Sequence, residues 1–327
     1  MFVTFYLPYK HTNKLLLKLF HGRGENLLDI EKDYKFYFFW LYHLGISKQT
    51  LSQIKNKLNE KDLVNIYNGH YLDYAISSIN FSQRDLQLLS NDTKFKLSKK
   101  DARSIIQKFN KVGVKVTFFY DYDFPTSLRN IPNPPFVIFT RGNYSILTNK
   151  DKLISIAGSR KISDASAEYL RRTVRDLVRG GYGTVSGLAL GTDIIANKST
   201  YLANGYTIAV LPGSIFSIIP KSHSVYADDI LKKNGLLLSE YYTDHFSKNN
   251  YIQRNRIISG LGKCLLLTEF NEHSGTIHTA RFAWLQRKKI FCFSNNSSGV
   301  KKLIGLNIAT PFRNISDFKW IGGEIND

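Results

Sequence analysis

Strand-length apolar runs alternate with amphipathic helical patterns through the second half of the chain, and glycines follow several of these runs. Residues 153–157 form a mostly apolar run, and the segment between Ser163 and Gly180 carries apolar side chains at helical spacing. Further strands are indicated at 184–186 and 207–211. Parallel strands need a crossover helix between them, so this alternation predicts βαβ units and a parallel sheet.

The alternation continues to about residue 293, which predicts an α/β fold with a doubly wound, mostly parallel sheet. Helices are expected at 222–233, from Arg254 and at 276–287, strands at 236–239, 264–268 and 289–293, and a polar loop from Glu240. The carboxyl ends of parallel strands share one edge, where helix amino termini point outward. We therefore expect the chemistry of this sheet to lie at that edge.

Residues 1–110 carry helical patterns without such strands. An aromatic run at 36–42 is followed by the turn Leu44-Gly45-Ile46 and a second helical stretch. An apolar-Gly-apolar turn between helices resembles a helix-hairpin-helix, whose turn amides can hold a phosphate, although the aromatic run is more simply explained as core. A β-like run begins at Val114, so we predict a helical domain at 1–110 and an α/β domain at 111–327.

The composition is strongly basic. The chain has 45 Lys and Arg residues against 26 Asp and Glu residues, and its formal charge of +19 is spread over both halves. This balance favours a surface that binds a polyanion, most simply a nucleic acid. The alternative is that the abundance of lysine, asparagine and tyrosine reflects coding bias alone.

Cysteine usage and hydropathy indicate the compartment. Cys264 and Cys292 each lie in an apolar strand-like run, which is typical of core thiols in a reducing environment. No window reaches the roughly 18 uninterrupted apolar residues of a membrane span, and the amino-terminal segment lacks a cleavage site. We therefore expect a cytoplasmic protein that does not enter a membrane.

A phosphate site is predicted at Gly158-Ser159-Arg160, directly after the first apolar run. A glycine there lets an anion approach the backbone, the following amides can point at it, and the guanidinium adds a bidentate clamp. The dinucleotide fingerprint Gly-x-Gly-x-x-Gly is absent here and at 187–191, and there is no Walker sequence. Intrinsic nucleotide hydrolysis is therefore not expected.

The segment 248–256 is a second candidate, because it combines cations, side-chain amides and an aromatic ring in an expected loop. Cations neutralise a phosphate backbone, and the ring of Tyr251 can stack on a base. Single-stranded nucleic acid binding requires this combination. The alternative is an ordinary basic loop in which Arg254 or Arg256 pairs with a carboxylate.

Residues of hydrolytic or metal chemistry do not form a recognisable set. Ser186 is outside a Gly-x-Ser-x-Gly turn, and His273 and His278 are not at metal-ligand spacing on one helical face. Asp193 and Glu240 are carboxylates that could pair with arginines at the sheet edge. The sequence therefore predicts a binding protein without a catalytic residue, a metal or a cofactor.

Taken in order, these motifs resemble the DprA (Smf) family of DNA-processing proteins. The resemblance covers roughly residues 115 to 310, and the amino-terminal region matches only in being helical and in its hairpin-like turn. The matching residues are Asp123-Phe124-Pro125 with Leu128, Arg141-Gly142-Asn143, Ile156 to Arg160, Ser186 to Asp193, Ile208 to Leu211, Leu238 to Tyr241, Arg254 to Gly260, and Ser274-Gly275-Thr276 with Thr279-Ala280.

The resemblance implies an extended Rossmann-like domain behind a small helical, SAM-like domain. Members of the family are homodimers that bind incoming single-stranded DNA during natural transformation and load the RecA recombinase on it, and they are not known as enzymes. Carried over by position, the DNA- or phosphate-binding residues are Gly158, Ser159, Arg160, Ser186, Gly187, Lys221, Lys248, Tyr251, Arg254, Asn255 and Arg256, and the dimer contact falls on Leu303 and Ile304.

Several positions depart from the family pattern. Asn197 replaces a usual histidine, Tyr251-Ile252 replaces Phe-Pro, and Ser294-Asn295 replaces Pro-Gly. An alternative function is a Rossmann-like enzyme that binds or hydrolyses a nucleotide, because related sheet-edge pockets hydrolyse nucleoside monophosphates. A nucleotide-sensing module whose output is assembly is a third alternative.

Overall fold

The computed structural model describes residues 33–148, 152–244 and 246–318. The chain divides into two compact units, Met1–Ile106 and Gln107–Asp327. The division falls inside α7 (Asp92–Val112), the helix that also contains the predicted boundary near residue 110. Each unit buries apolar side chains of its own.

The described part of the first unit consists of helices around an aromatic core. The helices are α2 (Tyr34–Leu44), α3 (Lys48–Lys57), α4 (Glu60–Tyr67), α5 (Tyr71–Ser77), α6 (Gln83–Ser90) and α7 as far as Ile106. α2 buries most of its aromatic side chains, and the buried Trp40 donates its indole N–H to Ser98 Oγ at 2.8 Å. The aromatic run is therefore core, and the predicted helical character of this region is confirmed.

The turn between α2 and α3 uses its backbone amides within the protein. Gly45 is left-handed (φ 99°), which lets the chain reverse at the end of α2. The N–H of Ser47, at the start of α3, donates to Asp85 at 2.9 Å, and Asp85 also accepts the hydroxyl of Thr50 at 2.6 Å. Asp85 is fully buried. A carboxylate of the chain thus lies where the helix-hairpin-helix hypothesis would place a phosphate, and that hypothesis does not fit this turn.

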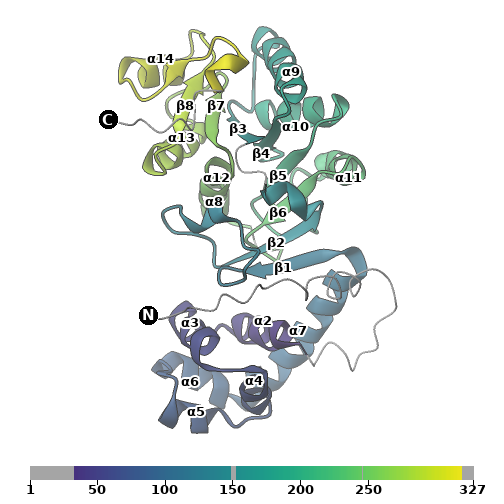
Figure 1. Cartoon of the computed structure of the whole chain (residues 1–327), viewed down its shortest axis with the longest axis vertical. Coiled ribbons are helices and arrows are strands. Elements are labelled where there is room, and N and C mark those ends of the chain that lie inside the picture. Colours follow the sequence, from purple (N-terminus) through teal and green to yellow (C-terminus); the bar gives the residue numbers. More distant parts are fainter. Residues whose placement is uncertain (1–32, 149–151, 245, 319–327) are drawn as a thin grey trace, which may run out of the picture. The chain divides into compact units, whose positions relative to one another are not determined.

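The second unit is built on one sheet, whose nine described strands have the order β1-β2-β6-β5-β4-β3-β7-β8-β9 (Figure 1). The strands are β1 (Val114–Phe118), β2 (Val137–Gly142), β3 (Leu153–Ala157), β4 (Gly183–Ser186), β5 (Thr207–Leu211), β6 (Leu236–Ser239), β7 (Cys264–Leu267), β8 (Lys289–Cys292) and β9 (Thr310–Pro311). β2 pairs antiparallel with β1 and β6, and the other neighbours are parallel. This sheet confirms the predicted fold class.

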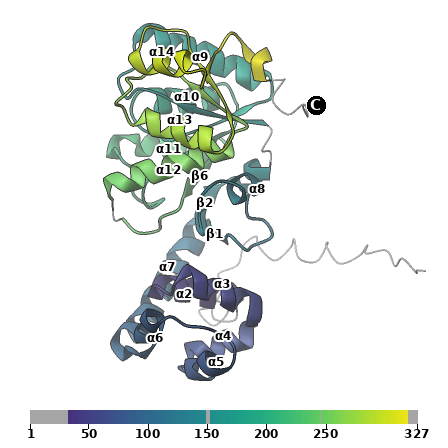
Figure 2. The same cartoon turned by 90° about the vertical axis from the view of Figure 1, so that its left-hand side faces the viewer.

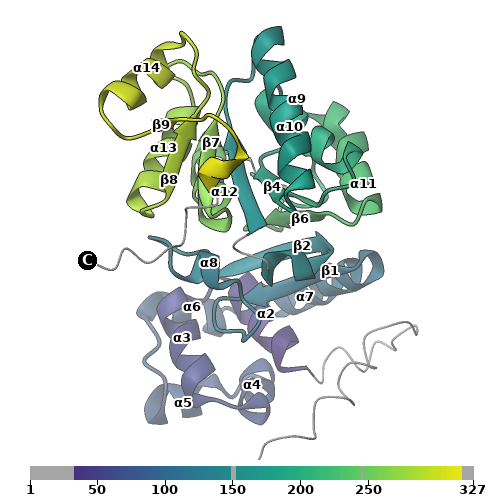
Figure 3. The same cartoon turned by 45° about the horizontal axis from the view of Figure 1, so that its top comes forward.

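Helices cover both faces of the sheet. They are α8 (Thr126–Arg129), α9 (Asp164–Arg179), α10 (Thr192–Leu202), α11 (Ser224–Lys232), α12 (Lys248–Leu261), α13 (Thr276–Leu285) and α14 (Ser298–Gly305). α9, α10 and α11 pack on one face, and α12 and α13 pack on the other (Figure 2 and Figure 3). Successive side chains of β3 point to opposite faces of the sheet. Ile154 packs in one hydrophobic cluster with Leu170 of α9, and Leu153 packs in another with Ile257 of α12.

Each helix within the described residues is too short or too polar to cross a membrane. The two cysteines, Cys264 and Cys292, are buried free thiols in β7 and β8, as their apolar surroundings predict. Burial raises the pKa of each thiol to about 12, so neither is an ionised nucleophile at neutral pH.

The predicted start of the helix between β6 and β7 is wrong. The helix expected from Arg254 begins at Lys248, where Ser247 caps it by accepting the N–H of Asn250 at 3.2 Å. Serine and asparagine favour turns as well as caps, which made this start look like part of a loop. The candidate segment 248–256 is therefore helical, and its side chains are distributed around a helix.

Asp85 gives the first unit a pH-dependent stability. Burial acts to raise its pKa, but hydrogen bonds from Thr50, Ser47 and Ser82 outweigh burial and hold the pKa below its ordinary value. A depressed pKa stabilises the folded state at neutral pH, and this contribution is lost as the pH falls through the depressed value. We expect Asp85→Asn to lower the free energy of unfolding by about 1–3 kcal/mol at neutral pH, measured by urea titration with circular dichroism.

The matched control is Asp73→Asn, which changes an exposed carboxylate of α5. The difference in unfolding free energy between wild type and Asp85→Asn should narrow as the pH is lowered below the ordinary carboxyl pKa of 3.8. A difference of equal size in acid and at neutral pH would contradict the stabilising role of the ionised Asp85.

Candidate functional site

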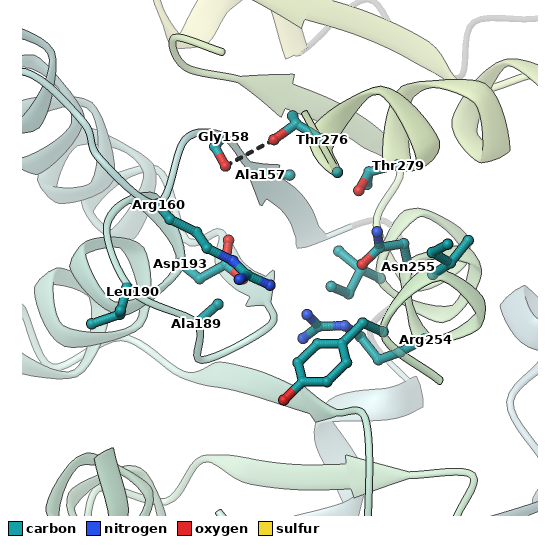
Figure 4. Close-up of a pocket in the computed structure, with 14 residues that line it drawn as sticks. Ala157, Gly158, Arg160, Ala189, Leu190, Asp193, Arg254, Asn255, Thr276 and Thr279 are labelled. Atoms are coloured by element: carbon teal, nitrogen blue, oxygen red, sulfur yellow. Dashed lines mark hydrogen bonds between the residues drawn. The ribbon is translucent and has the colours of Figure 1, made fainter. Parts of the chain in front are cut away.

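A pocket of about 340 Å³ opens at the carboxyl ends of the central strands (Figure 4). The loops after β3 and β4 form one side, and α12 and the amino terminus of α13 form the other. Strand order reverses at β3, because β4 lies on one side of it and β7 on the other, and doubly wound sheets bind ligands at such a point. The lining residues are Ala157, Gly158, Arg160, Ala189, Leu190, Asp193, Tyr251, Ile252, Arg254, Asn255, Ile258, Gly275, Thr276 and Thr279.

Gly158 lets three loops meet at the base of the pocket. A Cβ on it would lie 1.9 Å from Thr268 Oγ1 and 2.5 Å from Thr192 Oγ1, so a side chain cannot fit. Its carbonyl accepts the hydroxyl of Thr276 at 2.9 Å, which ties the start of α13 to the loop after β3. Thr276 thus helps to shape the pocket.

Ser159 supports the loop rather than presenting its polar groups to the pocket. Its N–H donates to the carbonyl of Glu269 at 2.8 Å, and its hydroxyl donates to the carbonyl of Lys161 at 2.8 Å. The expectation that the amide after Gly158 is available to an anion is therefore not met at Ser159. Of the predicted Gly-Ser-Arg turn, Arg160 is the residue whose side chain reaches the pocket (Figure 4).

The carboxylate of Glu269 lies at the amino terminus of α9, and the sequence did not predict this contact. Its carboxylate accepts the backbone N–H of Ser163 and the hydroxyls of Ser163 and Ser166, the latter two at 2.7 and 2.8 Å. Burial acts to raise the pKa of Glu269, but these hydrogen bonds outweigh it and lower the pKa. A negative charge of the chain therefore lies at the helix terminus that a dinucleotide phosphate occupies in related sheets.

Arg254 is a buried cation in the wall of the pocket, with only 5% of its surface exposed. Its Nη1 donates to the carbonyls of Gly187 at 2.7 Å and Val210 at 2.6 Å, which joins α12 to the loops after β4 and β5. Nε is buried as well and has no hydrogen-bond partner within the described ranges.

Asp193 compensates the charge of Arg254. Burial raises the pKa of Asp193, and the charge of Arg254 and the amides of Ala189 and Gly187 oppose that rise. Burial likewise lowers the pKa of Arg254, and Asp193 opposes that shift. The carboxylate therefore offsets part of the charge of Arg254 through space, which is weaker than the direct ion pair that the pairing hypothesis for Asp193 proposed.

Arg160 and Tyr251 face each other at the mouth of the pocket. The guanidinium carbon of Arg160 lies 5.9 Å from the ring centroid of Tyr251, and Arg160 is exposed whereas Tyr251 is half-buried. The side chains of Arg160, Arg254 and Asn255 point into the pocket (Figure 4). Two arginines and one described carboxylate line the pocket, so it carries a net positive charge and suits an anion beside an aromatic ring.

Arg256 lies away from the pocket. It is buried, and its Nη2 contacts both carboxylate oxygens of Glu240 at 2.7 Å. Two residues along a helix are about 200° apart around its axis, so Arg254 and Arg256 cannot face the same side. The structure thus places Arg256 in the buried ion pair that was the alternative for this segment.

The remaining predicted residues take different positions. Ser186 is buried and donates its hydroxyl to the carbonyl of Ile156 at 2.8 Å, and Gly187 lies against Arg254. Lys248 is exposed at the start of α12, one turn before Tyr251, and Lys221 is exposed in a short 3₁₀ helix that does not line the pocket.

The two residues predicted for a dimer contact differ in exposure. Leu303 of α14 is only 4% exposed and packs into the core, whereas Ile304 is half-buried. The neighbouring Leu306 is 59% exposed. A partner could therefore contact Ile304 and Leu306 directly and Leu303 only through them.

Residues 115–319 match the model of the family described as DNA recombination-mediator protein A. The chain belongs to this family, DprA or Smf. Protein Smf of Synechocystis is 34% identical over 179 residues, which are 54% of this chain and 45% of that protein. DprA of Bacillus subtilis is 30% identical over 206 residues, 61% of this chain and 69% of that protein. The match thus spans less than half the length of the Synechocystis relative.

Solved DprA structures have the same fold. The structure of DNA processing protein A from Helicobacter pylori, described for its unique single-stranded DNA binding mode, is 27% identical with a TM-score of 0.57. It covers 62% of this chain and 94% of its own. DprA from Streptococcus pneumoniae is 22% identical, has a TM-score of 0.66 and covers 88% of this chain and 97% of its own, which shows the shared fold.

Asn197, where the DprA family usually has a histidine, is a residue of the interior. It is fully buried in α10 and donates to Thr207 Oγ1 at 2.8 Å, in a group of hydroxyls that includes Thr184 and Thr200. It does not line the pocket. This departure therefore changes internal packing rather than the candidate DprA site.

Gly187 has no room for a side chain. A Cβ on it would lie 1.8 Å from Arg254 Nη1 and 2.5 Å from Asp193 Oδ2. Arg254 is buried and bound to two carbonyls, so we expect Gly187→Ala to displace its guanidinium and lower the free energy of unfolding by about 1–3 kcal/mol. Gly305→Ala is the matched control, since a Cβ on Gly305 meets nothing within 4 Å. Equal urea unfolding curves for the two variants would contradict this placement of Arg254.

Proposed function

We propose that this protein binds single-stranded DNA through the pocket at the carboxyl edge of its sheet. The observation that carries the proposal is the juxtaposition of exposed Arg160, buried Arg254 and the ring of Tyr251 in one pocket. The arginines suit a phosphate, and the ring suits a stacked base. An unpaired strand offers both groups, whereas a duplex keeps its bases stacked inside.

We further propose that the bound strand is handed to the RecA recombinase, in natural transformation or homologous recombination. Membership of a family described as DNA recombination mediators supports this step. The single-stranded DNA binding mode of the H. pylori relative supports the identity of the strand. The protein would act in the cytoplasm, as a binding protein rather than an enzyme.

A nucleotide enzyme receives less support. Glu269 fills the amino terminus of α9, where a nucleotide phosphate would otherwise bind. Asp193 is the carboxylate among the described pocket residues, and it is engaged with Arg254 rather than placed at a reacting atom. General-base catalysis needs a group within hydrogen-bond reach of the proton that it removes.

Substitutions in the pocket should weaken binding of a fluorescent oligothymidylate, followed by anisotropy. We expect Arg160→Ala to lower affinity about tenfold and to reduce the slope of log affinity against log salt by about 0.7, because one phosphate contact is lost. Tyr251→Ala should cost about 1–3 kcal/mol of binding free energy, and Tyr251→Phe should keep most of the affinity because the ring remains.

Arg171→Ala is the charge-matched control, since Arg171 is exposed on α9 and pairs with Glu168 at 3.4 Å. It should bind DNA almost as wild type does. The function would have to be abandoned if Arg160→Ala and Tyr251→Ala also bound with wild-type affinity while remaining folded.

We propose, finally, a homodimer formed through the exposed side of α14 and the turn after it. Leu306→Arg should convert the dimer to a monomer in light scattering, because it places a charge on a surface that the dimer would bury. Leu202→Arg is the matched control, since Leu202 is 63% exposed on α10. A Leu306→Arg protein that keeps the mass of a dimer would place the interface elsewhere.

A further inference from the structure

The amino-terminal edge of the sheet, at the opposite end of the strands from the pocket, carries a group of cations and rings. Lys152, Lys263 and Lys289 stand at the starts of β3, β7 and β8, which are neighbours in the sheet. Tyr182 and Tyr206 directly precede β4 and β5, the next two strands. These five residues are called the edge cluster. At about 4.8 Å per strand, the cluster extends over roughly 20 Å.

Direct contacts hold the members of the edge cluster side by side. The N–H of Lys263 donates to Leu153 O at 2.8 Å, which sets the start of β7 against that of β3. Lys263 Nζ lies 5.9 Å from the ring centroid of Tyr182. The hydroxyl of Tyr206 donates to the carbonyl of Lys152 at 3.4 Å. In strand order along the edge, the two rings therefore come first and the three lysines follow, with Lys152 and Lys263 nearest the rings.

The charges of the edge cluster are not neutralised by described carboxylates. Lys152 and Lys289 are exposed and Lys263 is half-buried, and no ion pair joins any of them to an acid in residues 33–148, 152–244 or 246–318. By contrast, Glu168 and Asp176 on α9 are both paired with arginines. The edge cluster thus keeps its positive charge for a partner.

A competing explanation is that lysines stabilise the carboxyl ends of helices, which also lie at this edge. Lys288 does this, because its Nζ donates to the carbonyl of Gly262, just after α12, at 2.7 Å. The ammonium groups of Lys152, Lys263 and Lys289 make no such hydrogen bond to a described carbonyl. Helix capping therefore accounts for Lys288 and leaves the edge cluster unexplained.

We propose that the edge cluster is a second contact for single-stranded DNA, occupied by a strand that continues beyond the pocket. This proposal rests on the proposed function for the identity of the ligand. Cations beside aromatic rings bind an unpaired strand without regard to its sequence, and the half-buried rings of Tyr182 and Tyr206 lie next to the lysines. β3 has five residues, so the two edges are about 16 Å apart, and a strand on the surface must follow a longer path between them.

Oligonucleotides of two lengths separate the two contacts. At about 3.4 Å per stacked nucleotide, an oligothymidylate of about 3 nucleotides spans roughly 10 Å, so it can enter the pocket but is shorter than the distance between the two edges, whereas one of about 30 nucleotides can reach both. The variant combines Lys152→Gln, Lys263→Gln and Lys289→Gln. We expect it to bind the short strand as wild type does and the long strand about tenfold more weakly. Its salt slope for the long strand should fall by about 2, for three lost contacts.

The charge-matched control combines Lys61→Gln, Lys94→Gln and Lys100→Gln, three exposed lysines of the first unit. It should keep the affinity of wild type for the long strand. If the edge variant binds the long strand as tightly as this control does, the proposal is overturned. In that outcome the proposed DNA binding by the pocket still stands, because it is tested separately, by the affinity of wild type and of Arg160→Ala for the short strand.

A second measurement does not depend on the folding of a triple variant. An oligonucleotide of about 30 residues carrying 5-iododeoxyuridine is photo-crosslinked to the wild-type protein, and the adducts are located by mass spectrometry. Adducts on Tyr182 or Tyr206 with the long strand, and not with the short one, support the proposal. Adducts confined to Tyr251 and other pocket residues overturn it while upholding the pocket, and no binding of either strand overturns both.

Discussion

The buried contact of Arg254 with the loops after β4 and β5 is the constraint on which the rest of the site depends. The guanidinium is bound to the carbonyls of Gly187 and Val210, and Asp193 offsets its charge. Separating a buried guanidinium from these partners would leave its charge uncompensated in the interior, which is costly. α12 is therefore fixed against the sheet, and the position of Tyr251 at the mouth of the pocket follows from it.

Two helix amino termini are filled by carboxylates of the chain itself. Asp85 accepts hydrogen bonds at the start of α3, and Glu269 does so at the start of α9. Helix amino termini attract anions, so each would otherwise compete with the pocket for phosphate. With the start of α9 occupied, anion binding in the pocket relies on the guanidinium groups of Arg160 and Arg254 together with the amino terminus of α13, which no side chain caps. That arrangement favours a flexible polyanion over a nucleotide held by a tight turn.

The strands and most helices of the second unit could be predicted, because apolar runs of strand length and helical spacing are local properties of the sequence. Residues 153–157, 184–186 and 207–211 were expected as strands and correspond to β3, β4 and β5 within one residue. The start of α12 could not be predicted, since Ser247 and the asparagines after it suit a loop equally well. β9 and α14 were not predicted, because both elements are too short to show a clear apolar pattern in the sequence.

The candidate site was harder to predict because it depends on helix phase and distant partners. Nothing in the local sequence distinguishes Arg254 from Arg256. Arg254 nevertheless lines the pocket, whereas Arg256 pairs with Glu240, which is 16 residues away along the chain. Glu269 lies 106 residues from Ser163, and only the closeness of β3 and β7 brings the two together. Such pairings follow from topology, so local patterns can name the candidates but not assign their roles.

The two edges of the sheet differ in their electrostatic background. Helix amino termini lie at the carboxyl edge, and their partial positive charge adds to that of Arg160 and Arg254. Helix carboxyl termini lie at the opposite edge, and their partial negative charge reduces the positive potential of the three lysines there. A strand should therefore be held most strongly at the pocket and more weakly along the lysines. The positive potential would then be highest at the pocket and lower at the lysines, so the end of a bound strand in the pocket would be held and the rest would exchange more readily. If the strand passes to a recombinase, as proposed, transfer would begin where the strand is held least.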